Sequence, residues 1–310
     1  MKQSISLVAL LVVTLQTGAV ASDTQSDVDH VETALVCEKR GDVAGALAEF
    51  EKALKQDPHD TIALNDRALL KLNLGKLNEA LSDVSAAIRF NTKDAILWCT
   101  KGDVQLAQNN YREALKDYNT SIALGLKDAI VYSNRGTTKT KLGDKPGALS
   151  DFQKAIEIDP KDLNGRYNKL KLTWDQASAK NELEQFTKLP ARSADDFFLL
   201  ANVDSKLGRR EKAIAEYSKT IKMRPLFEPA YFNRAVAYEE IGDDQSALAD
   251  YNKAIEIKNT NPKSYFNRSL LKSRLNDHQG AMADLNRAME LDPKMQTPGP
   301  EQRPFRMMES

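Results

Sequence analysis

Apolar and polar positions alternate with a helical period along most of the chain, and residues 231–257 show the pattern most clearly. Two apolar series there recur at i, i+4 and i+7, first as Tyr231, Ala235 and Tyr238 and then as Ala247, Tyr251 and Ala254. This spacing places each series on one face of an α-helix. Between the series stands Gly242, and glycine accepts the left-handed backbone that ends a helix. The stretch therefore predicts two amphipathic helices joined by a tight turn.

The same unit recurs with a period of 34 residues. The small residue of its second helix recurs at Ala46, Ala80, Ala114, Ala148, Ala213, Ala247 and Ala281. A large residue follows four positions later, as Phe50, Val84, Tyr118, Phe152, Tyr217, Tyr251 and Leu285. The turn glycine recurs as Gly41, Gly75, Gly143, Gly208 and Gly242. Asn109 takes its place in the third unit, and we expect the same turn because Asn also accepts left-handed backbone.

A 34-residue period with a small–aromatic–small pattern resembles the tetratricopeptide repeat family. Asp-Pro pairs after the second helix belong to the same pattern, at Asp57-Pro58, Asp159-Pro160 and Asp292-Pro293. The resemblance covers residues 27–295 and implies an all-α fold, a right-handed superhelical α-solenoid of stacked antiparallel helix pairs. A stacked array also accommodates 310 residues without one oversized core, because each unit buries its apolar face on its neighbours.

The units fall into two groups separated by an irregular segment. Units one to four occupy residues 27–162 and units six to eight occupy residues 194–295. Residues 163–193 lack the turn glycine and carry Glu182 at the small position, so we interpret them as a degenerate fifth unit. We expect five residues to keep this unit in the stack: Tyr167, Leu170, Trp174, Leu183 and Phe186. The alternative is a flexible junction between two modules, with residues 190–193 as its hinge.

The two ends of the chain carry no repeat. Residues 1–21 resemble a cleavable signal peptide, with Lys2, a short apolar stretch and the small-x-small site Ala19-Val20-Ala21. The apolar stretch is shorter than the roughly 20 residues that span a bilayer, so we expect no stable membrane insertion after cleavage. An exported protein is thus predicted, periplasmic or secreted if the source is bacterial. Residues 22–26 form a polar linker, and the proline-rich residues 296–310 predict a disordered tail.

Composition and motifs argue against several classes of function. Lys and Arg equal Asp and Glu at 44 each, so the sequence lacks a basic surface typical of nucleic-acid binding. His30, His59 and His278 are scattered without a second metal ligand nearby, and no phosphate-binding glycine loop or serine elbow occurs. Cys37 and Cys99 lie two units apart, too far for an internal disulfide. We expect no enzyme activity, no cofactor and no metal site.

The family resemblance implies that the first helices of successive units line a concave groove through their second, fifth, sixth and ninth residues. In the N-terminal half these positions are polar and mildly acidic: Asn65, Asp66, Cys99, Thr100, Asp103, Ser133, Asn134 and Thr137. In the C-terminal half they hold an aromatic series flanked by amides and one lysine: Phe198, Phe232, Phe266, Asn202, Asn233, Asn267 and Lys263. Aromatic rings supply apolar contact area and Asn side chains can bond a peptide backbone. The alternative is that the Phe rings pack between helices.

Some relatives clamp the C-terminal carboxylate of heat-shock chaperones with two Lys, two Asn and one Arg. Asn202, Asn233 and Lys263 match that pattern in this chain. Phe198 stands where a Lys is needed and Asn267 where an Arg is needed, which removes most of the charge-assisted hydrogen bonding. We therefore do not expect this clamp.

The sequence predicts a non-enzymatic scaffold whose concave groove, mainly in its C-terminal half, binds an extended peptide or a partner helix of another protein. The alternative is a structural subunit of an envelope or secretion complex that packs through its convex face and its last helix, where Met282, Leu285 and Met289 lie. Self-association would favour this second hypothesis.

Overall fold

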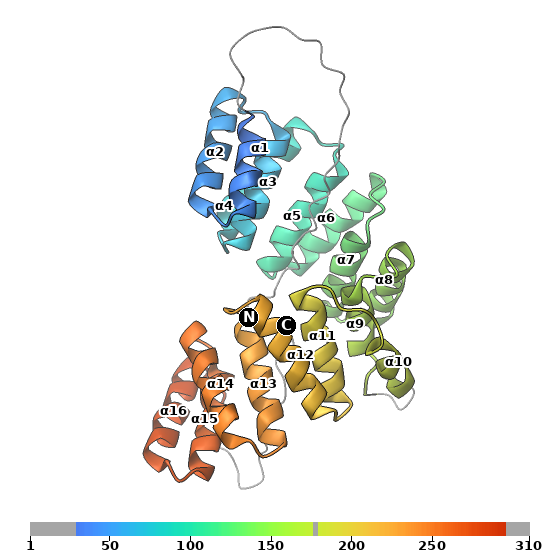
Figure 1. Ribbon diagram of the computed structural model, residues 1–310. Coiled ribbons are helices and arrows are strands. Elements are labelled where there is room, and N and C mark those ends of the chain that lie inside the picture. Colours follow the sequence, from blue (N-terminus) through green and yellow to red (C-terminus); the bar gives the residue numbers. More distant parts are fainter. Residues whose placement is uncertain (1–28, 176–178, 296–310) are drawn as a thin grey trace. The chain divides into compact units, whose positions relative to one another are not determined.

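The computed structural model describes residues 29–175 and 179–295, and the regular elements within these ranges are all α-helices (Figure 1). The all-α solenoid predicted from the sequence is confirmed, with successive helices packed as neighbouring pairs. The chain divides into two compact units, residues 1–169 and residues 170–310.

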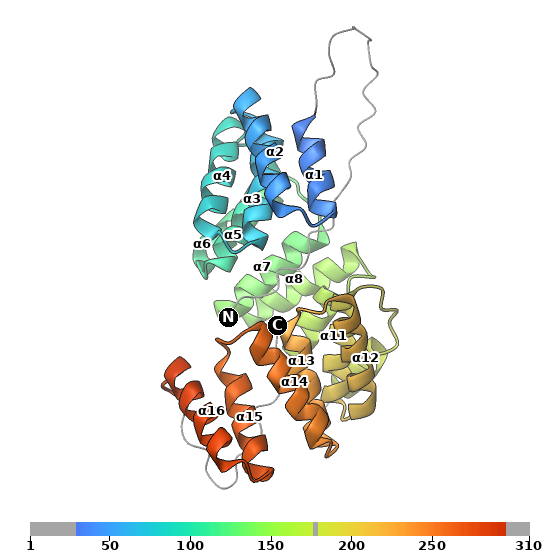
Figure 2. The same ribbon diagram turned by 60° about the vertical axis from the view of Figure 1, so that its left-hand side comes forward.

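The first unit contains four helix pairs, and the two helices of each pair pack against each other. Their bounds are α1 (His30–Lys39), α2 (Val43–Gln56), α3 (Thr61–Asn73), α4 (Leu77–Phe90), α5 (Ala95–Ala107), α6 (Tyr111–Ala123), α7 (Ala129–Lys141) and α8 (Lys145–Ile158). The second helix of each pair packs on the first helix of the next pair (Figure 2). The first helices also contact each other, α3 with α5 and α5 with α7. These first helices therefore form a continuous face.

The second unit repeats this arrangement with three regular pairs. Helix α9 (Leu163–Lys171) spans the division between the units, and α10 (Ala179–Phe186) follows it. The pairs are α11 (Ala194–Lys206) with α12 (Arg210–Met223), α13 (Glu228–Glu240) with α14 (Asp244–Ile257), and α15 (Pro262–Arg274) with α16 (His278–Leu291). Helices α12 and α14 pack on the first helix of the pair that follows.

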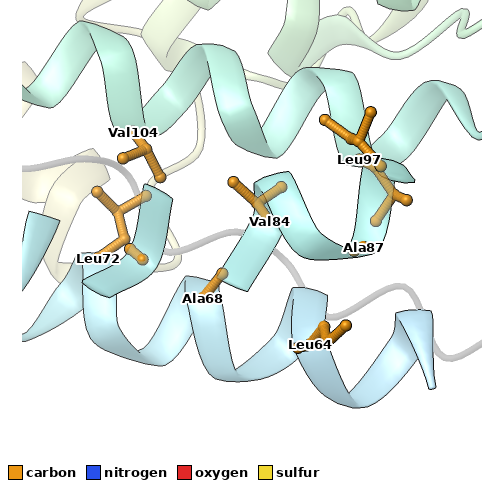
Figure 3. Close-up of a cluster of buried hydrophobic side chains, with 9 residues drawn as sticks. Leu64, Ala68, Leu72, Val84, Ala87, Leu97 and Val104 are labelled. Carbon is orange, nitrogen blue, oxygen red and sulfur yellow. The ribbon is translucent and has the colours of Figure 1, made fainter. Parts of the chain in front are cut away.

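The core lies between the two helices of a pair and the first helix of the next. Figure 3 shows one such cluster, in which side chains from α3, α4 and α5 point toward one another. Its labelled members are Leu64, Ala68, Leu72, Val84, Ala87, Leu97 and Val104. The small residues of the repeat, such as Ala68, let neighbouring helices approach closely, and the large residues fill the space between turns. Most apolar contact is thus made between consecutive helices, as expected of stacked repeats.

The turn inside each pair depends on a residue in left-handed backbone conformation. Gly75 has a φ of 74° and Gly242 a φ of 82°. Asn109 adopts the same conformation with a φ of 63°, which confirms the prediction for the third unit. Asn276 does so in the last unit with a φ of 64°. Asn is one of the few residues with a side chain that tolerates this conformation, so the turn keeps its geometry without glycine.

The irregular segment contains α9 and α10, and its apolar residues are largely buried as expected. Tyr167, Leu170, Leu183 and Phe186 are buried, and Trp174 is half-buried. The division between the compact units falls within α9, ahead of the hinge considered at residues 190–193. The predicted signal peptide, linker and tail lie outside the described residues. Among the helices that are described, none is long and apolar enough to cross a membrane.

In most pairs, a Lys or Arg side chain of the first helix forms an ion pair with a buried aspartate of the second helix. In the fourth pair Arg135 donates to both carboxylate oxygens of Asp151, at 2.9 and 2.6 Å, and its third nitrogen donates to Asn119 of the preceding pair. In the third pair Lys101 takes the place of the arginine and donates only to Oδ1 of Asp117, at 3.1 Å. Oδ2 of this buried carboxylate has no hydrogen-bond donor in the described structure. Burial consequently raises the pKa of Asp117.

We expect Lys101→Arg to raise the free energy of unfolding by about 1 kcal/mol, because a planar guanidinium can bond both oxygens of Asp117. Ser85 occupies the position corresponding to Asn119 and offers the third nitrogen an acceptor. Urea denaturation followed by circular dichroism measures the change. Lys154→Arg, at an exposed lysine paired with Glu157, is the control and should leave the midpoint unchanged. Equal midpoints for both variants would contradict this account of the orphaned oxygen.

Candidate partner-binding site

The structure places the three aromatic residues proposed for the C-terminal groove inside the core. Phe198 lies 5.1 Å from the ring of Phe227 and 5.8 Å from that of Tyr217, measured between centroids. Phe232 lies 5.8 Å from Tyr251 and is fully buried. Phe266 packs in the cluster of the last pair, against Ala288 and Met295. These positions agree with the packing alternative, and the rings offer little surface to a ligand.

The three amides beside these rings are also buried and bond within the protein. Asn202 Oδ1 accepts hydrogen bonds from the Tyr217 hydroxyl at 2.7 Å and from Asn233 Nδ2 at 3.0 Å. Asn267 Nδ2 donates to the Tyr251 hydroxyl at 3.3 Å. Amides held this way link one helix pair to the next and are not free to bond a peptide backbone. Among the seven predicted residues, only Lys263 is partly exposed.

In the first unit the corresponding face carries exposed apolar side chains. Ile62 is 65% exposed and Ile96 is 53% exposed, although both belong to a residue type that is usually buried. Ile130 is half-buried. Each is the second residue of a first helix, and α3, α5 and α7 contact in that order. We call these three residues the isoleucine stripe.

The isoleucine stripe lies on the face of the first helices that turns away from the core. On α3, Asn65, Asp66 and Leu69 follow Ile62 at i+3, i+4 and i+7 and so share its side of the helix. The core residues of α3 in Figure 3 are Leu64, Ala68 and Leu72, which occupy a different side. A partner that lies across α3, α5 and α7 would therefore contact the isoleucines without disturbing the packing.

Sequence reasoning missed this stripe, although a signal was present. The tripeptide Asp-x-Ile recurs at intervals of 34 residues, as Asp60-Thr61-Ile62, Asp94-Ala95-Ile96 and Asp128-Ala129-Ile130. In each case the aspartate accepts a hydrogen bond from the backbone N–H of the isoleucine, at 2.9, 2.9 and 2.7 Å. The aspartate is thus the helix N-cap, which starts the helix at this residue and fixes the isoleucine in its first turn.

Helix α5 carries a buried carboxylate, seven residues after Ile96, without a cationic partner among the described residues. Asp103 accepts hydrogen bonds from the Tyr118 hydroxyl at 2.7 Å and from Asn134 Nδ2 at 2.8 Å. It is 3% exposed, and burial raises its pKa to about 6. Burial, together with the charges of Asp103 and Asp128, also raises the pKa of the Cys99 thiol well above its usual value. Cys99 is accordingly a protonated, unreactive thiol at neutral pH.

Two further carboxylates face the same side at the N-terminal end of the stripe. Burial raises the pKa of Asp66, and the nearby charge of Asp60 raises it further. Burial also raises the pKa of Glu38, with an added contribution from the negative charge of Asp66. The negative charges of these residues therefore converge on one region of the face. Across the described ranges, no group of three His, Cys, Asp or Glu side chains is arranged to hold a metal ion.

Three models of the tetratricopeptide repeat match this chain. One matches residues 33–95 and 198–262, a second matches residues 129–162, and a third matches residues 262–295. Together they cover more than half of the sequence and leave the third unit and the irregular segment unmatched. No curated protein matches the chain.

Solved structures share the fold at low sequence identity. A chain of the APC/C hetero-tetramer Cut9–Hcn1 superposes with a TM-score of 0.66 at 14% identity, covering 82% of this chain and 50% of its own. A structure of the human IFIT1 dimer with PPP-AAAA gives a TM-score of 0.60 at 15% identity and covers 83% of this chain and 66% of its own. PilW, a type IV pilus biogenesis factor, gives 0.53 at 18% identity and covers 65% and 96%. This chain thus spans half the length of the Cut9–Hcn1 chain that it matches.

Proposed function

The chain belongs to the tetratricopeptide repeat family, and from this premise we propose that it is a protein-interaction scaffold that binds a segment of a partner protein along the isoleucine stripe. The observation that carries the proposal is the exposure of Ile62 and Ile96 on contacting first helices. Apolar side chains aligned across three repeats offer contiguous contact area, which is typical of interaction sites on proteins.

Binding would draw its free energy from the burial of apolar side chains on a surface that is already ordered. The helices beneath the stripe are fixed by N-caps, by the core of Figure 3 and by the Arg–Asp pairs, so binding requires little ordering of the scaffold. The partner segment would be an extended peptide or an amphipathic helix, since both can present side chains at intervals that reach successive repeats.

The structural neighbours are consistent with a role in protein assemblies, although their identity with this chain is low. Cut9–Hcn1 belongs to a multi-protein complex, and PilW is named for pilus biogenesis. The IFIT1 structure is a dimer with PPP-AAAA, which we take to be a negatively charged ligand. The carboxylates of Asp60, Asp66 and Asp128 on the first-helix face would repel such a ligand, so we favour a protein partner.

We further propose that the interaction takes place outside the cytoplasm. This rests on the sequence of residues 1–21, which has the charged start, apolar stretch and small-x-small site of an export signal. Mature protein beginning at Ser22 is therefore the form to test.

Replacing Ile62, Ile96 and Ile130 together by Ser should lower affinity for the native partner at least about tenfold, because the apolar contact area is lost while the fold is retained. Immobilised wild-type and variant proteins would be compared by affinity capture from the extracytoplasmic fraction, with helicity checked by circular dichroism. A control variant with Met223, Leu226 and Ile241 changed to Ser removes three exposed apolar residues elsewhere and should capture the partner normally.

Undiminished capture by the isoleucine variant would refute binding at this stripe. An assembly role through the last helix would then be favoured if replacement of Met282 and Met289 by Ser abolished capture. Both methionines lie on α16 and are exposed, at 59% and 37%.

A further inference from the structure

Negative charge follows the isoleucine stripe along its whole length. Asp60, Asp94 and Asp128 each stand two residues before an isoleucine and cap α3, α5 and α7. Each uses Oδ1 to accept a hydrogen bond from the backbone N–H of the isoleucine. The positive end of the helix dipole offsets part of that charge. The edge of the stripe nevertheless presents three carboxylates at the spacing of the repeats.

Two half-buried carboxylates of this face, Glu38 and Asp66, lack the cations that pair with the buried carboxylates Asp83 and Asp151 among the described residues of this unit. Asp83 pairs with Arg67 at 2.8 Å, and Asp151 pairs with Arg135 at 2.6 Å. No ion pair joins Glu38 or Asp66 to a Lys or Arg in the part of the chain that the structure describes. Their pKa values are raised by burial and by mutual or neighbouring negative charge, which means that ionisation there is unfavourable without a counter-charge. A cation supplied from outside would relieve this.

The side chain of Asn65, in the same region, has one polar atom without a hydrogen bond in the described structure. Asn65 is 8% exposed, and its Nδ2 donates to Oδ1 of Asp66 at 3.3 Å. Its own carbonyl oxygen has no donor in the described structure. Buried polar atoms in proteins are nearly always bonded, so one donor is missing beside Ile62 and Asp66. The unbonded oxygen of Asn65 and the unpaired carboxylate of Asp66 thus lie at the same end of the isoleucine stripe.

We propose that the partner segment bound along the isoleucine stripe is a cationic apolar peptide in extended form, in which apolar side chains contact the isoleucines and Lys or Arg side chains reach the flanking carboxylates. The inference rests on the proposed function and specifies its ligand class. Charge complementarity supplies the choice of occupant, because an acidic or neutral segment would leave the carboxylates of this face desolvated and unpaired.

The repeat geometry sets the spacing of such a segment. Adjacent packed helices lie about 8 to 10 Å apart, and an extended chain in the polyproline II conformation advances about 3.1 Å per residue, with every third side chain on the same side. Successive isoleucines therefore correspond to side chains roughly three residues apart in the peptide. The cationic residues occupy the intervening positions, where they can turn toward Asp60, Asp94 or Asp128 at the helix starts, or toward Asp66 within the face.

The second unit offers a natural contrast. Its first helices begin Ala194-Asp195, Glu228-Pro229 and Pro262-Lys263, so the position of the stripe holds no isoleucine and is charged in two of the three helices. Lys263 also places a positive charge on that face. The cationic apolar peptide is accordingly specific to the first unit, and residues of the second unit serve as internal controls.

The test uses two fluorescein-labelled peptides of about twelve residues that differ only in charge. One repeats Leu-Lys-Ser and the other repeats Leu-Glu-Ser, so that in the polyproline II conformation the leucines share one side at the spacing of the repeats. Fluorescence anisotropy with mature protein should give at least about tenfold tighter binding of the lysine peptide at low salt. Raising the ionic strength should reduce the ratio of the two peptide affinities, because salt screens the interaction between the partly exposed charges.

Neutralising the face should remove the preference. We expect Glu38→Gln with Asp66→Asn to weaken the lysine peptide about fivefold or more and to leave the glutamate peptide no weaker. The control is Glu51→Gln with Glu113→Gln, which removes the same charge from exposed positions of α2 and α6 and should keep the ratio of affinities. The Ile62, Ile96 and Ile130 to Ser variant should weaken both peptides.

The possible outcomes separate this inference from the proposed function. Equal affinity for the two peptides, both lost in the isoleucine variant, would overturn the cationic preference and leave the binding site in place. Binding unaffected by the isoleucine substitutions would overturn the site itself, and the inference with it. Failure of the wild type to bind the lysine peptide at concentrations up to about 1 mM would also contradict the proposal.

Discussion

Replacing Arg234 by Leu is expected to lower the free energy of unfolding by about 3 to 5 kcal/mol, because it leaves a buried carboxylate without its cation. Arg234 donates to both oxygens of Asp250, at 2.7 and 2.8 Å, and to the hydroxyl of Ser218 in the preceding pair at 2.8 Å. Asp250 is 6% exposed, and burial raises its pKa even with the guanidinium in place. When the arginine is removed, the unfavourable free energy of burying the Asp250 carboxylate is no longer offset by an ion pair.

A matched substitution in the first unit should have a much smaller effect. Arg67 makes the same two bonds to Asp83, yet Lys71 also lies 2.8 Å from that carboxylate. In the repeat of Arg234 the equivalent position holds Tyr238. Arg67→Leu leaves one cation at its aspartate, so we expect about half the loss seen for Arg234→Leu.

Urea denaturation followed by circular dichroism compares the two variants, with the double variant Arg234→Leu, Asp250→Leu as a further test. Removing both charges should recover much of the lost stability, because the unpaired carboxylate is gone. Equal losses for Arg67→Leu and Arg234→Leu, or no recovery in the double variant, would show that the arginines act through packing and not through charge.

The fold could be predicted from the sequence because its key positions are local and repeated. Ala247, Tyr251 and Ala254 recur on one face of one helix, and all three are fully buried. The turn at Asn109 followed from the backbone preference of a single residue. Such features depend on neighbours within about 34 residues, so the same residue pattern recurs in each repeat.

The burial of the aromatic series was harder to predict. Phe232 lies next to Tyr231, and helical periodicity places both near the boundary between the core and the first-helix face. Which one turns inward depends on how the following repeat packs, and the sequence of one repeat does not contain that information. In the structure Phe232 is fully buried and Tyr231 is half-buried. The choice between binding and packing therefore stayed open until the packing was known.

The buried polar groups left a signal that sequence reasoning did not use. In two of the three repeats with a tyrosine at the large position of the second helix, the ninth residue of the first helix is Asp or Asn, as in Tyr118 with Asp103 and Tyr217 with Asn202. In the third repeat Tyr251 donates to Glu239 instead. Phe152, in the same position, has no hydroxyl to place. The difference between Phe and Tyr at one repeat position thus marks where a polar layer crosses the core.

The two polar layers differ by one charge, which makes a reciprocal exchange informative. Asp103 accepts from Tyr118 and Asn134 at 2.7 and 2.8 Å. Asn202 accepts through Oδ1 from Tyr217 and Asn233 at 2.7 and 3.0 Å. The partners stand at the same sequence separations in both networks. The protein therefore already contains a neutral version of the Asp103 site.

We expect Asp103→Asn to raise the free energy of unfolding by about 2 kcal/mol at pH 7.5 and to leave it nearly unchanged at pH 4. The pKa of Asp103 is about 6 in the folded protein, against about 3.9 for an unfolded aspartate. Because the folded pKa is raised, the contribution of this group to stability is complete below about pH 4 and is lost as the pH rises through 6. A shift of two pKa units corresponds to a stability gain of roughly 3 kcal/mol when the charge is removed. The buried N–H₂ group of the new asparagine costs part of this gain where it lacks an acceptor.

The measurement is the difference in unfolding free energy between variant and wild type from pH 4 to pH 8, since other carboxylates contribute equally to both and cancel. Asn202→Asp should produce the opposite result, a loss that grows over the same range as the introduced carboxylate is forced to ionise in the core. A difference that is flat with pH for both exchanges would mean that neither site is closed to water. If only Asp103→Asn is flat, the first-helix face hydrates Asp103 in solution, and the carboxylate would then be available to a cationic partner alongside Asp66.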